Sequence, residues 1–430
     1  MLRILFPTPR RASRRTASAA LRLAGLVGLS AVLAVAPLHA GESAPEDAPL
    51  VPTPIGKALE PVEPWLRHED WTLRSMAALD MRSRSDPGLI WLLTRLLHRE
   101  NDTRVIGCAL AALEGRPRVD LIREGGVTLI DALARAARHD HPTVRERARR
   151  IMMRTPPIRL GDDFARYEGW WKRGREALRL EQQRLKRAAE QQPTPPTSSS
   201  SETKKNPNRI YEHWERIRRH GLEMCIILDH TGSMTPVIGA AKSRIQKLLD
   251  RVGTFVPVFR VGLVTYDDRA MKRIALSMQR EAIQKAFDRV GAGGGADPEE
   301  GVDKGIYLAM QQDQMGWSRS AQRVLVVVGD APPHEVDVPR LLRHLVTSRV
   351  DDLYDHPLVV HTVSTPSHGT PGDVVEHFER IAEAGGGQHT SIRDAALLVD
   401  RLVLLSFGGG ADPERVRRWM KEIKGLSKKP

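Results

Sequence analysis

Residues 224–234 read MCIILDHTGSM, and this stretch decides the fold of the longest part of the 430-residue chain. Five apolar residues in succession, ended by an acidic residue and a turn, are typical of a short strand that is buried on both faces of a sheet. The amphipathic pattern over residues 236–251 predicts that a helix follows directly. The stretch therefore begins a strand–turn–helix unit.

The same alternation of apolar runs and amphipathic segments continues to residue 407. Further buried strands are predicted at 258–266, 324–328 and 358–364, and helices near 281–290, 299–314, 338–349, 373–384 and 394–406. Strands that alternate with helices in this way predict an α/β fold, a doubly wound parallel sheet with helices on both faces. Such sheets bind ligands at the carboxyl ends of their strands, so those ends are the first place to look for function.

Two of the predicted strand ends carry oxygen-bearing side chains. Asp229, Thr231 and Ser233 follow the first strand at alternate positions, and Asp330 follows the strand at 324–328. Neighbouring parallel strands would place Asp330 beside Asp229, where two buried carboxylates repel each other unless a cation lies between them or one is protonated. Carboxylate and hydroxyl oxygens are the ligands of small divalent cations. Alternatively, the residues after the first strand simply cap the next helix.

These residues resemble the von Willebrand factor A domain and its metal-ion-dependent adhesion site, whose first motif is Asp-x-Ser-x-Ser. Asp229-x-Thr231-x-Ser233 fits the motif with Thr at the first hydroxyl, and the resemblance spans residues 209–407. It implies that the two hydroxyls bind Mg²⁺, the expected ion, or Mn²⁺ or Ca²⁺. It also implies that Asp229 and Asp330 act largely through water, and that an acidic residue of a protein partner completes the coordination of the ion.

One part of the site departs from the family pattern. The family supplies a further Thr from a Gly-rich loop, whereas residues 293–300 here read GGGADPEE, which resembles a Gly-Gly-Asp-x-Pro-Glu subset of the family. Asp297 or Glu299 is then the candidate replacement ligand. The same loop formally matches a dinucleotide-binding fingerprint, but it follows a predicted helix and its carboxylates would repel a phosphate.

Residues 65–175 have a different character and predict short helices. Leu73, Val105 and Val144 each begin a similar segment after a polar turn, at spacings of 32 and 39 residues. This stretch resembles HEAT-type repeats, in which pairs of helices stack into an interaction scaffold. An irregular helical bundle is the alternative that the pattern leaves open.

The positive charge lies in the flanking segments of the chain. The formal net charge is +13, but residues 1–40 hold six Arg and no acidic residue, while residues 221–407 hold 20 Lys and Arg against 24 Asp and Glu. Such a distribution argues against a nucleic-acid partner. The basic stretches are interpreted as solvated faces, with peripheral contact to an anionic envelope surface as the alternative.

The N-terminal segment has the layout of a signal peptide, with basic residues ahead of an apolar run and a small-residue end. This predicts export, or a membrane anchor if the segment is retained. Cys108 and Cys225 are the only cysteines, which is compatible with export if both are buried. The predicted organisation is a signal peptide at 1–40, a Pro-rich segment at 41–64, helical repeats at 65–175, a charged helix and flexible linker at 176–208, the A-type domain at 209–407 and a basic tail at 408–430.

The sequence thus predicts an exported, non-enzymatic binding protein that uses a divalent ion to contact a protein partner. Two alternatives stay open. One is a degenerate A-type domain that binds its partner without a metal, and the other is an enzyme subunit in which the ion acts as a Lewis acid. No catalytic residue or organic cofactor is predicted, because the chain contains neither a His-Glu-x-x-His nor a Gly-x-Ser-x-Gly motif.

Overall fold

The computed structural model describes the chain from residue 59 to residue 427, apart from seven short gaps and one longer one at residues 192–207. The described ranges are 59–157, 160–161, 163–191, 208–267, 271–293, 299–349, 351–366, 372–408 and 412–427. The predicted signal peptide at 1–40 and most of the predicted flexible linker lie outside these ranges. Within them, no helix has the length and apolarity needed to cross a bilayer.

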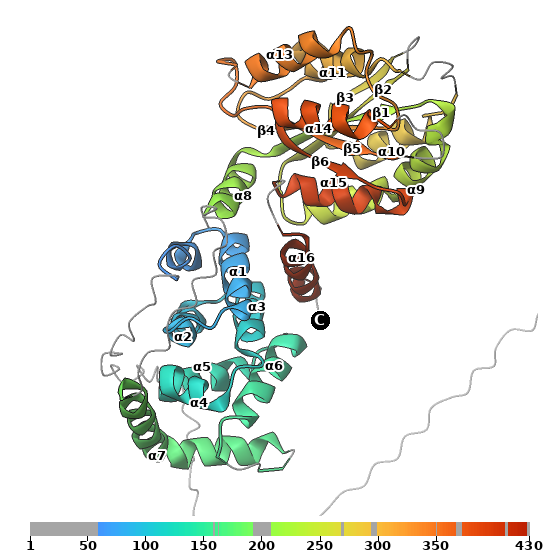
Figure 1. Cartoon of the computed structure of the whole chain (residues 1–430). Helices are drawn as coiled ribbons and strands as arrows, with labels where there is room; N and C mark the ends of the chain where they lie inside the picture. The colour runs from blue at the N-terminus through green and yellow to red at the C-terminus, as the bar shows by residue number, and fades with distance from the viewer. Residues whose placement is uncertain are drawn as a thin grey trace, which may run out of the picture. The chain divides into compact units, whose positions relative to one another are not determined.

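The N-terminal part of the described chain is helical (Figure 1). Its elements are η1 (Glu63–Arg67), α1 (Trp71–Asp80), η2 (Met81–Ser83), α2 (Leu89–Arg99), α3 (Thr103–Leu113), α4 (Arg118–Asp120), η3 (Leu121–Gly125), α5 (Gly126–Ala136), α6 (Pro142–Met153) and α7 (Phe164–Glu190). Cys108 is buried among the apolar residues of α3. Helix α7 runs through residue 175 without a break, so the predicted boundary at 175/176 falls inside a continuous helix.

Two of the polar turns that precede the predicted repeats share one hydrogen-bonding pattern. At the start of α1, Arg74 donates to the carbonyl oxygens of His68 and Glu69, and the His68 ring accepts from the amide of Asp70. At the start of α6, Arg145 and the ring of His139 make the corresponding bonds, to the carbonyls of residues 139 and 140 and from the amide of residue 141. The self-similarity of the sequence therefore has a structural counterpart, while the assignment to HEAT repeats stays a prediction.

The C-terminal part is an α/β domain that helix α8 (Arg209–His220) introduces. The six-stranded sheet has the order β3-β2-β1-β4-β5-β6. The strands are β1 (Leu222–Asp229), β2 (Phe259–Tyr266), β3 (Lys272–Ser277), β4 (Gln322–Gly329), β5 (Val359–Ser364) and β6 (Gly386–Ser391). All neighbouring strands are parallel except β3, which runs antiparallel to β2 at one edge. The predicted doubly wound α/β sheet is confirmed, and the two edge strands, β3 and β6, are additions to the four buried strands that the sequence predicts.

Helices cover both faces of this sheet (Figure 1). One face packs against α9 (Thr235–Gly253), α10 (Arg280–Asp288) and α15 (Leu398–Ser406), which η5 (Ala395–Leu397) precedes. The other face packs against α11 (Val302–Met310), α13 (Val338–Ser348) and α14 (Val374–Ala384), and the short α12 (Gln312–Met315) lies beside β3. The central strands are buried throughout, as strands sandwiched between two helical layers must be. Cys225 lies in β1 and is also buried.

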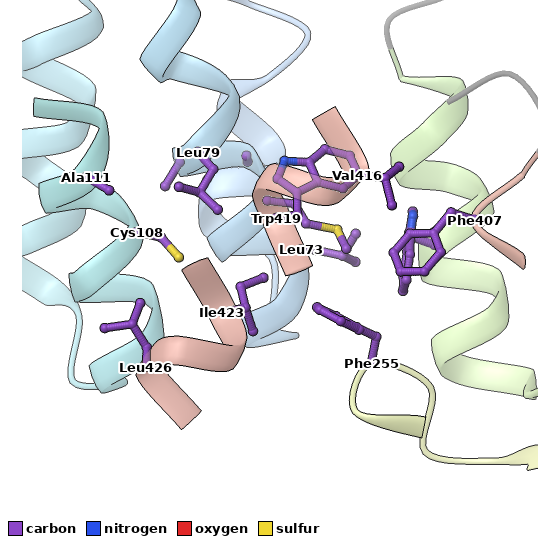
Figure 2. Close-up of a cluster of buried hydrophobic side chains, with 14 of the residues drawn as sticks. Leu73, Leu79, Cys108, Ala111, Phe255, Phe407, Val416, Trp419, Ile423 and Leu426 are labelled. Carbon is purple, nitrogen blue, oxygen red and sulfur yellow. The ribbon is translucent and has the colours of Figure 1, made fainter. Parts of the chain in front are cut away.

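The predicted basic tail is not a solvated segment. Residues Pro413–Ser427 form helix α16, which packs against α1 and α3. Figure 2 shows Trp419, Ile423 and Leu426 lying against side chains of these helices. The apolar residues recur at 416, 419, 423 and 426, a helical spacing that gives α16 one buried face, while Arg417, Lys421 and Lys424 are exposed.

A buried polar cluster also joins α1, α8 and α16. The carboxylate of Asp80 is 6% exposed and accepts hydrogen bonds from the hydroxyl of Tyr211, from the guanidinium of Arg415 and, at 3.1 Å, from the indole nitrogen of Trp419. Burial lowers the pKa of Arg415, but the bonds to Asp80 outweigh it and raise that pKa above its ordinary value. The segments that enter and leave the α/β domain are thus both attached to the first helix of the N-terminal part.

Candidate metal site

The candidate site lies where β1 and β4 end side by side. The two strands are paired in parallel, with Leu228 opposite Val328, so their carboxyl ends meet at one edge of the sheet. Asp229 is the last residue of β1, and Asp330 follows the last residue of β4. Asp229 is fully buried and Asp330 is 5% exposed. The predicted neighbourhood of the two strand ends is confirmed.

Hydrogen bonds and one short oxygen–oxygen contact connect four of the predicted site residues. The backbone N–H and the hydroxyl of Thr231 donate to Oδ1 of Asp229 at 2.9 and 2.7 Å. The hydroxyl oxygens of Thr231 and Ser233 lie 3.1 Å apart, and Ser233 donates to Oδ1 of Asp330 at 3.0 Å. Thr231 directly precedes the turn η4 (Gly232–Met234), and Ser233 lies within it. Four side chains therefore present their oxygens to one small region.

The other two predicted ligands have different outcomes. Asp297 lies outside the described residues. Glu299 is described, and its carboxylate lies 3.0 Å from Nδ1 of His334, so it is engaged in a pair with that ring. The neighbouring Glu300 is only 2% exposed, and its amide donates to the carbonyl of Pro332 in the loop after β4.

Sequence reasoning missed two buried groups that belong to this region, Glu300 and Tyr266. Tyr266 is the last residue of β2 and lies opposite Asp229 in the paired strands. Glu300 and the two aspartates are the carboxylates that raise the pKa of the Tyr266 hydroxyl, in addition to the larger effect of its complete burial. The signal for Tyr266 was present in the sequence, because it ends the strand at 258–266 just as Asp229 ends the first strand.

Gly329 makes room for this arrangement. A Cβ atom at position 329 would lie 2.6 Å from the hydroxyl oxygen of Tyr266, closer than real Cβ contacts permit. It would also lie 3.3 Å from Cβ and 3.4 Å from Oδ2 of Asp229. The absence of a side chain at position 329 therefore leaves room for the Tyr266 hydroxyl beside this part of Asp229.

The electrostatics of the site favour a cation. Burial raises the pKa of Asp229 from its ordinary value of 3.8 to about 6; the hydrogen bonds from Thr231 oppose this shift, and the charge of Asp330 adds to it. Oδ2 of Asp229 is buried and has no hydrogen-bond partner among the described residues. A carboxylate oxygen without a donor is costly in such surroundings, and a hard divalent cation or its water would satisfy it.

The donor set also indicates which ions fit. The described ranges contain no group of three or more His, Cys, Asp or Glu side chains placed to hold a metal. Any ion at this site would therefore depend on the hydroxyls of Thr231 and Ser233 together with the carboxylates. Oxygen donors of this kind suit Mg²⁺, Ca²⁺ or Mn²⁺ rather than a soft metal.

The raised pKa of Asp229 predicts a pH-dependent stability of the ion-free protein. Between about pH 4 and pH 6 the native state binds a proton at Asp229 that the unfolded chain has released, so stability falls as the pH rises through this window. Asp229→Asn carries no such proton. Without ions, the unfolding free energy of the variant minus that of the wild type should increase by roughly 2 kcal/mol from pH 4 to pH 7. Urea unfolding across this range measures the difference, and a constant difference would show that Asp229 does not titrate as described.

Residues 223–394, which run from β1 past the end of β6, match the model of the von Willebrand factor A domain family. Together with the sheet topology, this match identifies the α/β part of the chain as a von Willebrand factor A domain with its Rossmann-like fold.

Two curated proteins share sequence with the chain. An uncharacterised protein of Synechocystis sp. is 29% identical over 169 residues, which are 39% of this chain and 37% of that protein. The alpha-protein kinase vwkA of Dictyostelium discoideum is 30% identical over 121 residues, which are 26% of this chain and 19% of the kinase. The chain thus spans well under half the length of either relative.

Two solved structures are similar to part of the chain. An aerotolerance-related membrane protein from Bacteroides fragilis is 16% identical, with a TM-score of 0.32, over 44% of this chain and 98% of its own. The protein BatB from Bacteroides thetaiotaomicron is 14% identical, with a TM-score of 0.33, over 47% of this chain and all of its own. At such identities and scores, neither neighbour bears on function.

Proposed function

We propose that this protein is an exported, non-enzymatic binding protein whose A domain holds a divalent ion and contacts a protein partner through it. The observation that carries the proposal is the convergence of Thr231, Ser233 and two aspartates at one sheet edge, with Oδ2 of Asp229 buried and lacking a donor. A site of oxygen ligands at the carboxyl ends of parallel strands is where such a fold binds its ligands. A domains commonly mediate protein–protein contacts, which agrees with this role.

The hydroxyls of Thr231 and Ser233 would bind the ion directly. Asp229 and Asp330 would contact it largely through water. Two carboxylates balance the charge of a divalent ion, so long-range attraction toward an acidic partner is weak. The contribution of the partner then comes from direct coordination, with a carboxylate oxygen at the open position of the ion. When bound, the ion supplies a coordination bond across the interface.

A second candidate function is a metal-independent scaffold. Its support is that the hydroxyls of Thr231 and Ser233 donate directly to Asp229 and Asp330. In this alternative these bonds simply fix the loop after β1, and partners bind the surface that this loop presents. In both candidate functions, the helical N-terminal part would be a second interaction surface.

A capture experiment separates the two candidates. The full chain is immobilised and exposed to envelope proteins, either with about 5 mM Mg²⁺ or with a chelator. This Mg²⁺ concentration is chosen to load a weak site of oxygen ligands. The proposal predicts retention with Mg²⁺, release by the chelator, and no retention by a Thr231→Val/Ser233→Ala variant. Prior amidation of the carboxyl groups of the captured proteins should also prevent retention. Equal retention by both chains with the chelator present would favour the metal-independent scaffold.

A further inference from the structure

The hydroxyl of Tyr266 is an unusual group for its surroundings. It belongs to a side chain that is completely buried at the end of β2, and it has no hydrogen-bond partner among the residues that the structure describes. A phenol keeps its proton at neutral pH, so this oxygen is a donor that nothing accepts from. A buried donor without an acceptor is destabilising, and such groups call for an explanation in a folded protein.

A buried acceptor that also lacks a hydrogen-bond partner lies nearby. Oδ1 of Asp229 accepts two bonds from Thr231, whereas Oδ2 is buried and accepts none. The Tyr266 hydroxyl and this Oδ2 both border the space above Cα of Gly329, since a Cβ there would lie 2.6 Å from the first and 3.4 Å from the second. An unpaired donor and an unpaired charged acceptor therefore lie close to the same point beside Gly329.

We propose that Tyr266 is a positioning residue of the ion site, and that its hydroxyl donates to Oδ2 of Asp229, directly or through one water, when the ion is bound. This inference rests on the proposed ion site. The bond holds Asp229 as an oriented carboxylate, so that Oδ1 stays available to Thr231 and the Thr231 hydroxyl oxygen presents its lone pairs outward.

Tyr266→Phe removes only the hydroxyl and leaves the ring packed against its buried apolar neighbours. Two effects of opposite sign are expected. The melting temperature of the ion-free chain should stay equal or rise, because an unsatisfied donor has been removed from the interior. The affinity for Mg²⁺ should fall on the order of tenfold, because the charged form of Asp229 has lost a hydrogen bond.

A matched control is available in α11. The hydroxyl of Tyr307 is also buried without a partner, and Tyr307→Phe makes the same chemical change away from the strand ends. Calorimetric titration of Mg²⁺ and thermal melts with and without Mg²⁺ are measured for the wild type and both variants. Tyr307→Phe should bind Mg²⁺ as the wild type does.

The outcomes distinguish a failure of the role of Tyr266 from a failure of the proposed ion site. If the wild type binds no ion, the ion site itself fails. If the wild type binds and Tyr266→Phe binds equally well, the site stands and the role of Tyr266 is overturned. A lower ion-free melting temperature in Tyr266→Phe, with unchanged affinity, would likewise overturn it and make the hydroxyl purely structural.

Discussion

Replacing Asp80 by Asn should destabilise the protein by about 3–5 kcal/mol, which is typical of removing one partner from a buried ion pair. The substitution leaves the guanidinium of Arg415 without its counter-charge in an interior position. It also gives the hydroxyl of Tyr211 a poorer acceptor, because a neutral amide oxygen replaces a carboxylate. Chemical unfolding of the full chain measures the loss. Hydrogen exchange of residues 413–427 should accelerate in parallel, since Asp80 binds α16 through two of its side chains.

An exposed ion pair on the same helix provides the control. Arg417 and Glu414 form a pair one turn apart, and the side chains of both are more than half exposed. Arg417→Met should change stability by less than about 1 kcal/mol, as is usual for surface pairs. If Asp80→Asn cost no more than this control, the cluster would not hold α16 to the N-terminal helices.

The Thr231→Val/Ser233→Ala double variant should weaken Mg²⁺ binding at least about a hundredfold, because both hydroxyl ligands are lost and each ligand bond contributes on the order of 1–2 kcal/mol. Both replacements are close in size to the originals, so the domain should remain folded. Mg²⁺ should raise the melting temperature of the wild type and leave that of the variant unchanged.

The matched control for this variant lies in α13. Thr347 is exposed there and bonds only to carbonyl oxygens of its own helix. Thr347→Val/Ser348→Ala makes the same pair of changes and should keep the full response to Mg²⁺. An equal response in all three chains would mean that the hydroxyls at 231 and 233 are not ligands.

Much of the fold follows from local pattern. The strands β1, β2, β4 and β5 are apolar runs because both of their faces are covered, and the sequence predicts all four. Strands β3 and β6 are not among the predicted buried strands because both lie at an edge of the sheet: in β3 only Leu276 is buried, and in β6 no residue is fully buried. An exposed edge strand leaves no long apolar run to recognise.

The C-terminal helix shows how charge can hide a core element. Residues 413–427 hold five Lys and Arg against two Glu, and this basic composition led to the prediction of a tail. The signal that could have found α16 is the apolar spacing of Val416, Trp419, Ile423 and Leu426. The partner of this helix could not be predicted, because its docking depends on Gly107 of α3, where a Cβ would collide with the side chain of Leu426.

The candidate site, like the fold, could be predicted from the sequence only in part. Asp229 and Asp330 could be placed together from the strand pattern alone, because parallel strands end at one edge. The role of Tyr266 could not, since it depends on which face of β2 its ring occupies and on the space that Gly329 leaves. The pairing of Glu299 with His334 depends on how two loops fold back on each other, which no local periodicity specifies.

The measurement that tests the central claim most directly is calorimetric titration of Mg²⁺ into the full wild-type chain, carried to millimolar concentration because such a site lacks the partner's carboxylate. The account predicts one saturable site that disappears in Thr231→Val/Ser233→Ala and persists in Thr347→Val/Ser348→Ala. Absence of saturable binding in the wild type at millimolar Mg²⁺, Mn²⁺ and Ca²⁺ would contradict the ion-mediated mechanism, and the metal-independent scaffold would take its place.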